Sequence, residues 1–357
     1  MTWADRVDLT TGRPVEAPNM RPVGASSSVI IVWPWVNGAH NWPPMSYSPR
    51  TGLVYIPGMD VKQILDARGI DPDSYKPDRV EQWLGYSDIV GRSPEALAAL
   101  QADKSEQSAW LQARDPRTNK MVWQVKQPGL WAGGTLTTGG DLVFIGQASG
   151  HLVAYDGRSG QELWRFNCGR AISAPPISYE LDGRQYVAVL VGWGGMPAVE
   201  GALADPASRM TYRDGGRGLF VFALGGKASA RMTPVGSVIP IDVTDFVPDP
   251  DSVKRGEHLF DNNCNLCHGT DVLSGGEAPD LRASPLAANR KTLGDIVLRG
   301  TLLLRGMPRY VDFSEADVDS LFQYIRWRAR KDLACQARPA TGGDSASDPG
   351  CASSFLQ

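Results

Sequence analysis

The sequence has no long apolar run, no excess of one charge and few cysteines. Its longest apolar stretch, around residues 29–36, is interrupted by Pro34 and is shorter than the roughly 18 residues that a membrane span requires. The 36 basic and 39 acidic residues leave a formal charge of −3 and form no block of like charge, which excludes a nucleic-acid or membrane-surface footprint. Five cysteines in 357 residues exclude a disulfide framework.

The first residues have neither a basic segment nor an apolar one. Met1 is followed directly by TWADRVDLTTG, so we expect no secretion signal in this chain. A hydrophobic share of 42% and a charged share of 21% are ordinary for globular proteins and exclude a disordered or fibrous chain.

Glycine, proline and tryptophan are frequent and predict an all-β repeat protein over part of the chain. The 39 glycines, 26 prolines and 11 tryptophans are typical of many tight turns packed around large aromatic side chains. Residues 113–123 (ARDPRTNKMVW) match residues 154–164 (AYDGRSGQELW) at an offset of 41 residues. This offset falls within the roughly 40 to 45 residues of a four-stranded propeller blade.

The repeat also predicts turns and strands. In each copy, and in shorter echoes at residues 8–12 and 48–52, an Asp or Ser side chain binds the backbone two residues on, and a Gly or Asn four positions later takes a positive φ. Trp123 and Trp164 are predicted to pack between neighbouring blades. The predicted strands are residues 53–56, 142–145, 152–155, 186–191 and 219–224.

Residues 1–226 have room for about four blades, which is the lower limit for a closed propeller or half of a larger one. The charged, helix-prone residues 58–110 interrupt the repeat, so we expect a surface insertion between two strands.

A helical domain is predicted at residues 248–335, after a linker at residues 227–247 that is rich in Pro, Ser and Val. Ser314 is a good N-cap with Asp317 three residues on, and Phe313 and Val318 occupy hydrophobic-staple positions. Apolar residues then recur at helical spacing. The polar residues 336–357 are predicted to be a disordered tail.

Cys264, Cys267 and His268 lie in the sequence CNLCH, the attachment pattern of haem c. Two thiols on one helical turn add to the two vinyl groups of haem, and the next residue's imidazole is then held under the iron. A thioredoxin-type pair would require a βαβ setting, and a zinc site would require a second ligand pair at finger spacing. The sequence has neither, so the motif predicts covalent haem.

Met307 is the predicted sixth ligand of the haem iron. It is the single methionine after His268, no further histidine follows, and Gly306 and Pro308 would hold its thioether on a rigid loop. Core packing is the alternative for Met307. The Pro279 carbonyl is the predicted acceptor for the imidazole N–H, which would fix the orientation of the ring.

Longer stretches resemble known families. GEHLFDNNCNLCHG, GGEAPDLR and RGMPRYVDFSEADVDSLFQYIRWRA resemble a class I cytochrome c domain, in which Gly256 and Phe260 would cross the last helix near Tyr324. WADRVDLTTGRPVE, GAHNWPPMSYSPRTGLVYIP, LWAGGTLTTGGDLVFIGQASGHLVAYDGRSGQELW and DGRQYVAVLVGWGG resemble the quinohaemoprotein alcohol dehydrogenases. The resemblance implies a periplasmic enzyme with an eight-bladed propeller that holds pyrroloquinoline quinone (PQQ) and calcium, followed by a haem-c domain.

The resemblance covers the C-terminal half of that family. The family's catalytic aspartate, calcium ligands and the tryptophan under the quinone have no counterpart in these residues, so we assign no catalytic residue and no calcium ligand. Asn41 and Trp42 of NWPPM and Trp131 of LWAGGTL are implied to approach PQQ. A turn-forming role for Asn41 and plain packing for the two tryptophans are the alternatives.

Two functions follow from these patterns. The first, which we favour, is the C-terminal part of a PQQ-dependent alcohol dehydrogenase that passes electrons from reduced quinone to haem c. The acceptor would be a cytochrome, an azurin-like protein or a membrane quinone, and the intact enzyme would oxidise an alcohol in the periplasm. The second is a stand-alone haem-c electron-transfer protein whose small propeller binds a partner and which has no dehydrogenase activity.

Three cysteines lie outside the haem motif. Cys168 is expected to be a buried free thiol near an inner strand. Cys335 and Cys351 enclose 15 residues, which an oxidising compartment could close into a disulfide, although the polar composition of the tail equally permits free thiols.

Overall fold

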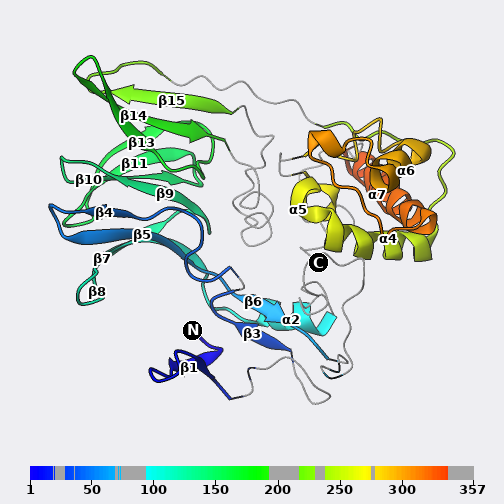
Figure 1. The fold of residues 1–357 in the computed structure, drawn as a ribbon, viewed down its shortest axis with the longest axis horizontal. Helices are drawn as coiled ribbons and strands as arrows, with labels where there is room; N and C mark the ends of the chain where they lie inside the picture. The colour runs from blue at the N-terminus through cyan, green and yellow to red at the C-terminus, as the bar shows by residue number, and fades with distance from the viewer. Residues whose placement is uncertain are drawn as a thin grey trace, which may run out of the picture. The chain divides into compact units, whose positions relative to one another are not determined.

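The computed structural model describes residues 1–18, 20, 29–35, 37–68, 71, 73, 94–192, 217–229, 238–274 and 278–336. The chain divides into two compact units. Unit 1 comprises residues 1–70 and 90–235 and is built mainly of strands, and unit 2 comprises residues 71–89 and 236–357 and is helical where it is described (Figure 1). The predicted order of a β-propeller part followed by an all-α domain is therefore confirmed.

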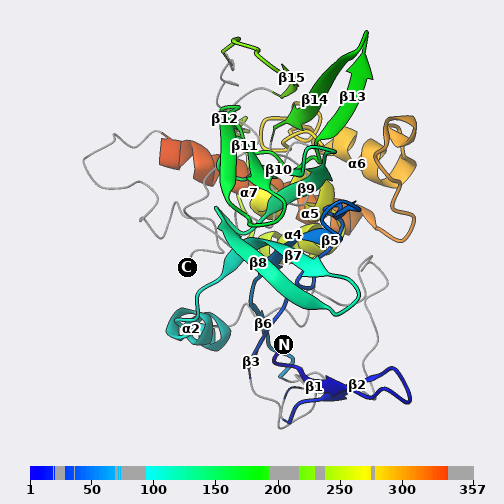
Figure 2. The same cartoon turned by 90° about the vertical axis from the view of Figure 1, so that its left-hand side faces the viewer.

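Unit 1 is a row of antiparallel sheets, which lie side by side (Figure 1, Figure 2). Two sheets have four strands, in the orders β4-β5-β7-β8 and β12-β11-β10-β9, a third has the order β13-β14-β15, and the pairs β1-β2 and β3-β6 form two-stranded sheets. The strands are β1 (Ala4–Val7), β2 (Pro14–Glu16), β3 (Ile30–Val32), β4 (Ser46–Ser48), β5 (Leu53–Asp60), β6 (Gln63–Leu65), β7 (Ser108–Asp115), β8 (Lys120–Gln127), β9 (Ala132–Thr137), β10 (Leu142–Gln147), β11 (His151–Asp156), β12 (Glu162–Asn167), β13 (Ile177–Leu181), β14 (Arg184–Val191) and β15 (Gly218–Ala223).

The predicted strands and the repeated turns both form. Asp156 Oδ1 accepts the backbone N–H groups of Arg158 (3.0 Å) and Ser159 (2.8 Å), and Gly160 follows with a φ of +74°. In the matching turn one repeat earlier, Asn119 is the residue with positive φ. Each turn joins two strands of a four-stranded sheet, so the repeat in the sequence corresponds to one sheet of the row.

The interface between the two four-stranded sheets is apolar. Trp123 packs against its buried cluster, and the Trp123 Nε1 donates to the Gly157 carbonyl in the turn of the next sheet (3.0 Å). Trp164 in turn contacts Phe222 of β15, with ring centroids 5.5 Å apart. Both tryptophans thus lie between neighbouring sheets, as predicted. The buried cluster consists of Leu53, Tyr55, Leu111, Ala113, Val143, Ile145, Val153 and Tyr155.

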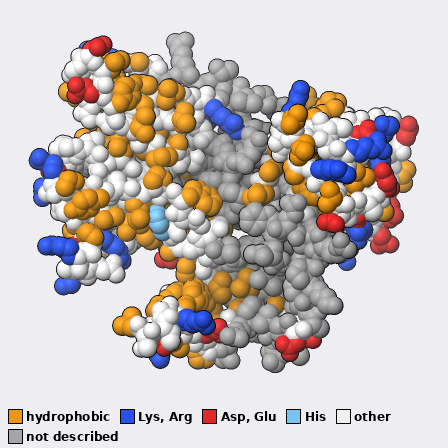
Figure 3. All heavy atoms as spheres, viewed as in Figure 1, with side chains coloured by type: hydrophobic (Ala, Val, Ile, Leu, Met, Phe, Trp, Pro, Cys, Tyr) orange, Lys and Arg blue, Asp and Glu red, His pale blue; other side chains and the backbone are white. Residues whose placement is uncertain are grey.

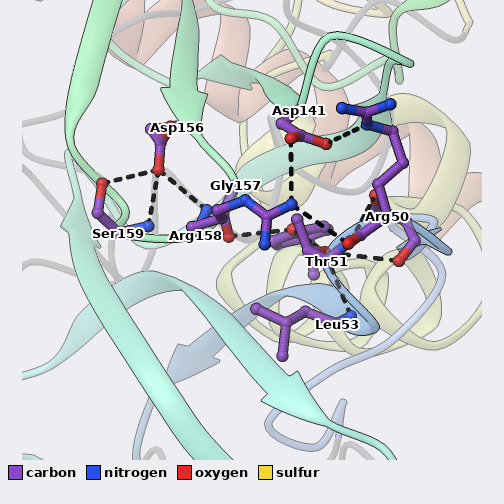
Figure 4. A network of polar contacts seen from close by, with 10 residues as sticks. Arg50, Thr51, Leu53, Asp141, Asp156, Gly157, Arg158 and Ser159 are labelled. Atoms are coloured by element: carbon purple, nitrogen blue, oxygen red, sulfur yellow. Dashed lines mark hydrogen bonds and ion pairs between the residues drawn. The ribbon is translucent and has the colours of Figure 1, made fainter.

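A polar network joins the same two sheets (Figure 4). Asp141 accepts from Arg50 Nε (2.9 Å) and from Arg158 Nη2 (3.3 Å), and Arg158 also donates to the Arg50 carbonyl (3.2 Å). The bond from Arg50, with a smaller contribution from Arg158, holds the pKa of Asp141 below its ordinary value. Since Arg50 lies in the turn between β4 and β5, this network fixes that turn against the neighbouring sheet.

The segment that leaves the sheet is shorter than the predicted insertion at residues 58–110. β5 continues to Asp60, which pairs with Ser108 at the start of β7. Gly58 lies within this strand opposite Trp110, whose ring occupies the space where a Cβ would be, 2.2 Å away. The predicted helix within the insertion is α2 (Pro94–Ala102), and residues 74–93 lie outside the described part of the chain.

Cys168 is a buried free thiol, as predicted. It lies in an apolar cluster with Leu152 and Ile172, and burial raises the pKa of its thiol to about 11. The group is therefore an inert part of the core at neutral pH.

Unit 2 is organised around the crossing of its first and last helices. A Cβ on Gly256 of α4 would lie 1.9 Å from the Ser320 carbonyl oxygen of α7, so this close approach requires glycine. Phe260 and Tyr324 pack beside it, with ring centroids 5.6 Å apart, which confirms the predicted crossing. The described elements are α4 (Pro250–Asn263), α5 (Asn265–His268), η1 (Thr270–Val272), α6 (Arg290–Arg299), η2 (Leu303–Arg305) and α7 (Glu315–Gln336).

α7 begins at the predicted capping box. Asp317 N–H donates to Ser314 Oγ (3.2 Å), and Ser314 N–H donates to Asp317 Oδ2 (2.8 Å). Phe313 and Val318 are both buried in the core of the unit. None of the described helices is long and apolar enough to cross a membrane.

Part of the predicted linker packs on unit 2. Arg330 of α7 donates to the carbonyls of Val243 and Phe246 (2.7 Å each), and the Phe246 side chain is buried. This segment has no periodicity because backbone carbonyls, rather than a repeated apolar face, hold it to the helix. At the other end, Cys335 is disulfide-bonded, while Cys351 and the predicted tail from residue 337 onward lie outside the described residues.

Candidate haem-attachment site and its surroundings

The CNLCH motif forms a tight helical turn at the end of α4. Cys264 N–H donates to the Phe260 carbonyl (2.7 Å), and α5 follows directly and ends at His268. Neither cysteine of the motif is disulfide-bonded. Cys264 packs against the apolar core, where burial raises the pKa of its thiol to about 12, whereas Cys267 is exposed. In this turn Cys264 lies four residues before His268 and Cys267 lies one residue before it.

His268 is held as a neutral imidazole. Its side chain is 6% exposed, and its Nδ1 lies 2.9 Å from the Pro279 carbonyl oxygen, the predicted partner. Because a carbonyl can only accept, Nδ1 carries the proton and Nε2 keeps its lone pair. Burial lowers the pKa of His268 despite the opposing effect of the Pro279 bond, so the ring is uncharged at neutral pH.

The chain turns sharply after His268. Gly269 has a φ of +80°, and a Cβ at this position would lie 1.8 Å from the Leu273 carbonyl oxygen. Asp271 also has a left-handed backbone, and its carbonyl accepts from Arg328 Nε of α7 (3.2 Å). The histidine is therefore fixed by a glycine-dependent turn and by a buried arginine of the last helix.

Met307 lies on a loop that contacts the same turn. Gly306 precedes it with a φ of +90°, and Tyr310, three residues later, donates its hydroxyl hydrogen to the Asn263 carbonyl next to Cys264 (2.7 Å). Met307 and Cys264 pack against one common apolar core. The structure thus brings the loop of Met307 to the haem motif, and its role as the iron ligand stays a prediction.

These donors fit haem c. The set offers two cysteines that are not disulfide-bonded for thioether bonds, a neutral imidazole and a thioether sulfur on a neighbouring loop. These are the groups that His/Met-ligated haem c uses.

The three residues predicted near PQQ are partly brought together in unit 1. Trp42 stacks on Trp131, with ring centroids 5.2 Å apart and an interplanar angle of 25°. Asn41 Nδ2 donates to the Asn37 carbonyl (2.9 Å), which is a local turn contact. Trp131 is 2% exposed, and Trp42 is 53% exposed. The geometry places one open indole face over one buried indole.

Trp35 belongs to the same cluster and was not predicted as a site residue. Its ring packs edge-on against Trp131, with centroids 6.0 Å apart. The Nε1 atoms of Trp35 and Trp131 are both buried without a hydrogen-bond partner. Buried donors that lack an acceptor are uncommon, and PQQ offers carboxylate and carbonyl oxygens, so this cluster fits the quinone. The sequence around Trp35, WPWVNG, gave no signal that separates it from a packing tryptophan.

Calcium is different. Among the described residues no group of three or more His, Cys, Asp or Glu side chains could hold a metal ion. The described residues therefore offer no cluster of acidic side chains of the kind that binds calcium.

The fold and the site together define a propeller-type β part joined to a cytochrome c domain. Residues 14–187 match the family model described as the β-propeller domain of glucose/ethanol/alcohol dehydrogenases, and residues 251–325 match the model described as cytochrome c oxidase, cbb3-type, subunit III.

Full-length relatives carry both parts. The chain is 38% identical over 346 residues to quinohemoprotein alcohol dehydrogenase ADH IIB of Pseudomonas putida, covering 95% of this chain and 47% of the relative. It is 34% identical over 333 residues to the quinohemoprotein alcohol dehydrogenase of Comamonas testosteroni, covering 92% and 44%. The chain thus spans about half the length of the curated relatives it matches.

Solved structures agree with this assignment. The structure of ADHIIG from Pseudomonas putida HK5 matches with a TM-score of 0.71 at 29% identity, covering 92% of this chain and 47% of that one. The Comamonas testosteroni enzyme matches with a TM-score of 0.63 at 34% identity, covering 95% and 47%. Over 92% to 95% of its length, the chain is therefore similar to quinohaemoprotein alcohol dehydrogenases.

Proposed function

We propose that this chain is the electron-relay part of a PQQ-dependent alcohol dehydrogenase, which passes electrons from reduced quinone to haem c and on to an external acceptor. The observation that carries the proposal is His268, which directly follows the second of two cysteines that are not disulfide-bonded. The Pro279 carbonyl fixes Nδ1 of its buried, neutral imidazole. Such an arrangement leaves Nε2 as the one ring nitrogen available to iron.

Four residues of unit 2 have a direct role in this proposal. Haem c supplies an iron that alternates between two oxidation states and so carries one electron at a time. Cys264 and Cys267 would hold the macrocycle through thioether bonds, while His268 and Met307 would bind the iron from its two sides. The apolar core behind Cys264 and Met307 would exclude water from one edge of the group.

Unit 1 would bind the quinone through its tryptophan cluster. PQQ takes up the two electrons of the alcohol, and the stacked pair Trp42 and Trp131 would pack against its flat ring system. Asn41 would donate to it through the second N–H of its side-chain amide, since one N–H is bound to the Asn37 carbonyl. The full reaction, its alcohol and its calcium site are properties that we assign to the intact enzyme by similarity to these relatives.

The partners and compartment follow from the same similarity. We propose a periplasmic protein whose haem passes electrons to a cytochrome, an azurin-like protein or a membrane quinone. A stand-alone electron carrier is less well supported, because residues 14–187 match the β-propeller domain of glucose/ethanol/alcohol dehydrogenases.

The ligand assignment is tested by replacing Met307 with Ala in the haem-loaded chain. We expect loss of the thioether-to-iron absorption band and a lower reduction potential, because a Met/His pair raises the potential of haem c. Met45→Ala, which changes an exposed methionine of unit 1, is the matched control and should leave both unchanged. Spectrum and potential are measured by potentiometric titration. Identical curves for wild type and Met307→Ala would show that another group is the sixth ligand.

A further inference from the structure

α7 carries arginines that bind backbone carbonyls of the segments around the haem motif. Arg326 and Arg328 are 2% and 3% exposed, and Arg330 lies one turn beyond Arg326. Each donates to carbonyls rather than only to carboxylates. Burying a charged guanidinium costs desolvation free energy, so these contacts with carbonyls reduce the net stability that the helix packing provides.

Arg326 has the most buried position of the three. Its Nη1 donates to the carbonyls of Ile241 (3.1 Å) and Arg282 (3.4 Å), and its Nη2 donates to the Leu281 carbonyl. Burial lowers the pKa of Arg326 to about 10, against the weaker effect of Asp280, so the side chain remains charged at neutral pH. Charge-assisted bonds to three carbonyls are stronger than neutral ones, which offsets part of the desolvation cost.

The residues that Arg326 holds form the loop that contacts His268. Pro279 begins this loop, and its carbonyl accepts from His268 Nδ1. Arg282 binds Asp280 through two bonds (3.0 and 2.7 Å) and also reaches Asp332 of α7 (2.6 Å). The loop is thus fastened to α7 twice, once through its backbone by Arg326 and once through the Arg282 side chain.

We propose that Arg326 is a positioning residue for the proximal histidine: it holds the 279–282 loop against α7 and so keeps the Pro279 carbonyl on His268 Nδ1. The inference rests on the proposed haem function. A hydrogen bond of this kind fixes the ring orientation and increases the basicity of the coordinating nitrogen, so a displaced carbonyl changes the iron ligand without touching it.

The test compares two arginines of the same helix in the haem-loaded full chain. Arg326→Met removes the donors to the loop but keeps a long side chain. Arg330→Met is the matched control, because Arg330 also donates to two backbone carbonyls, but to those of Val243 and Phe246. The readout is the His268 Nδ1 proton in reduced, diamagnetic protein with ¹⁵N-labelled histidine, together with its exchange rate with solvent.

We expect exchange of this proton to be about tenfold faster in Arg326→Met, since losing charge-assisted bonds increases the population in which the loop opens. In Arg330→Met, both the resonance and the exchange rate should match wild type even if the protein melts earlier. Equal exchange rates in the two variants would overturn the proposal and leave Arg326 with a general packing role.

Arg326→Lys keeps the inference testable if the methionine variant does not fold. One ammonium group can reach fewer carbonyls than a guanidinium, so an exchange rate between those of wild type and a fully released loop is expected. A wild-type rate in Arg326→Lys would contradict the proposal. Failure of the proposed haem function would give a different result from failure of the Arg326 proposal. Wild-type protein without covalent haem would show no signal from an iron-bound His268.

Discussion

At the scale of single residues, Asp317 makes the stability of the start of α7 depend on pH. Burial raises the pKa of this carboxyl, but bonds from Ser314 and the ion pair with Arg255 lower it more, so the pKa in the folded protein lies below the ordinary 3.8. A carboxylate with a depressed pKa contributes stability at pH values above 3.8. This contribution is lost as the pH falls through the lower, folded pKa.

Asp317→Asn should therefore destabilise unit 2 by about 1 kcal/mol at neutral pH, because it weakens the capping box. The difference in unfolding free energy between the variant and wild type should shrink as the pH falls below 3.8. It shrinks because Asp317 of the folded wild type becomes protonated as the pH passes through its lower, folded pKa. Thermal unfolding followed by circular dichroism at several pH values measures this. Asp319 lies on the same helix as Asp317, and Asp319→Asn, which removes an exposed ion pair with Arg290 of α6, serves as control and should change stability little. A constant difference at all pH values would contradict the assignment.

Some site residues could be predicted from the sequence, and others could not. His268, Pro279 and the box of Ser314 and Asp317 follow local patterns whose partners lie close in the chain or at known offsets. Arg326 gave no signal, because its partners lie 44 or more residues away and a buried charge looks like a surface one in sequence. The roles predicted for the tryptophans near PQQ still depend on family resemblance.

At the scale of elements, unit 1 depends on contacts between successive sheets. The two matched repeat tryptophans use different contacts: Trp123 donates to the Gly157 carbonyl of the next sheet, whereas Trp164 makes ring contacts with Phe144, Phe166 and Phe222. The same repeat position thus joins one interface by a hydrogen bond and packing, and the next by aromatic packing.

This difference predicts unequal effects of one substitution. Trp123→Phe should destabilise unit 1 by about 1 to 3 kcal/mol, since it leaves the buried Gly157 carbonyl with one donor fewer and reduces packing. Trp164→Phe should cost less, because Trp164 is 39% exposed and Phe retains aromatic contact. Urea unfolding midpoints of the two variants test the order. Equal losses, or a larger loss for Trp164→Phe, would contradict the proposed role of the Nε1 bond.

Element positions in unit 1 were predictable because turns and alternating strands leave clear patterns. The predicted boundaries differ from the structure where contacts with distant residues determine where an element begins or ends. Residues 58–60 form strand because the Trp110 ring fills the space beside Gly58, which is a contact between strands that no local pattern shows. Residues 238–246 belong to unit 2 because Arg330 holds their carbonyls, again a contact with a distant element.

At the scale of the whole molecule, the chain joins two units with different tasks and matches about half the length of its relatives. Apolar side chains gather on β13, β14 and β15 (Figure 3). Ile177, Leu190 and Leu219 are 58%, 62% and 63% exposed on this sheet. Exposed apolar side chains on one face of a sheet are typical of a surface that packs against other structure.

The central claim is that unit 2 carries haem bound covalently through Cys264 and Cys267. The most direct measurement is a haem stain of a denaturing gel, after expression of the chain in the periplasm with a cytochrome c maturation system. We expect the wild type to stain, and the Cys264→Ala, Cys267→Ala double variant to lose the stain, because denaturation removes haem that is not held by thioether bonds. Cys168→Ala, which changes the buried thiol of unit 1, should stain like wild type. Stain that persists in the double variant, or an unstained wild type, would contradict the account.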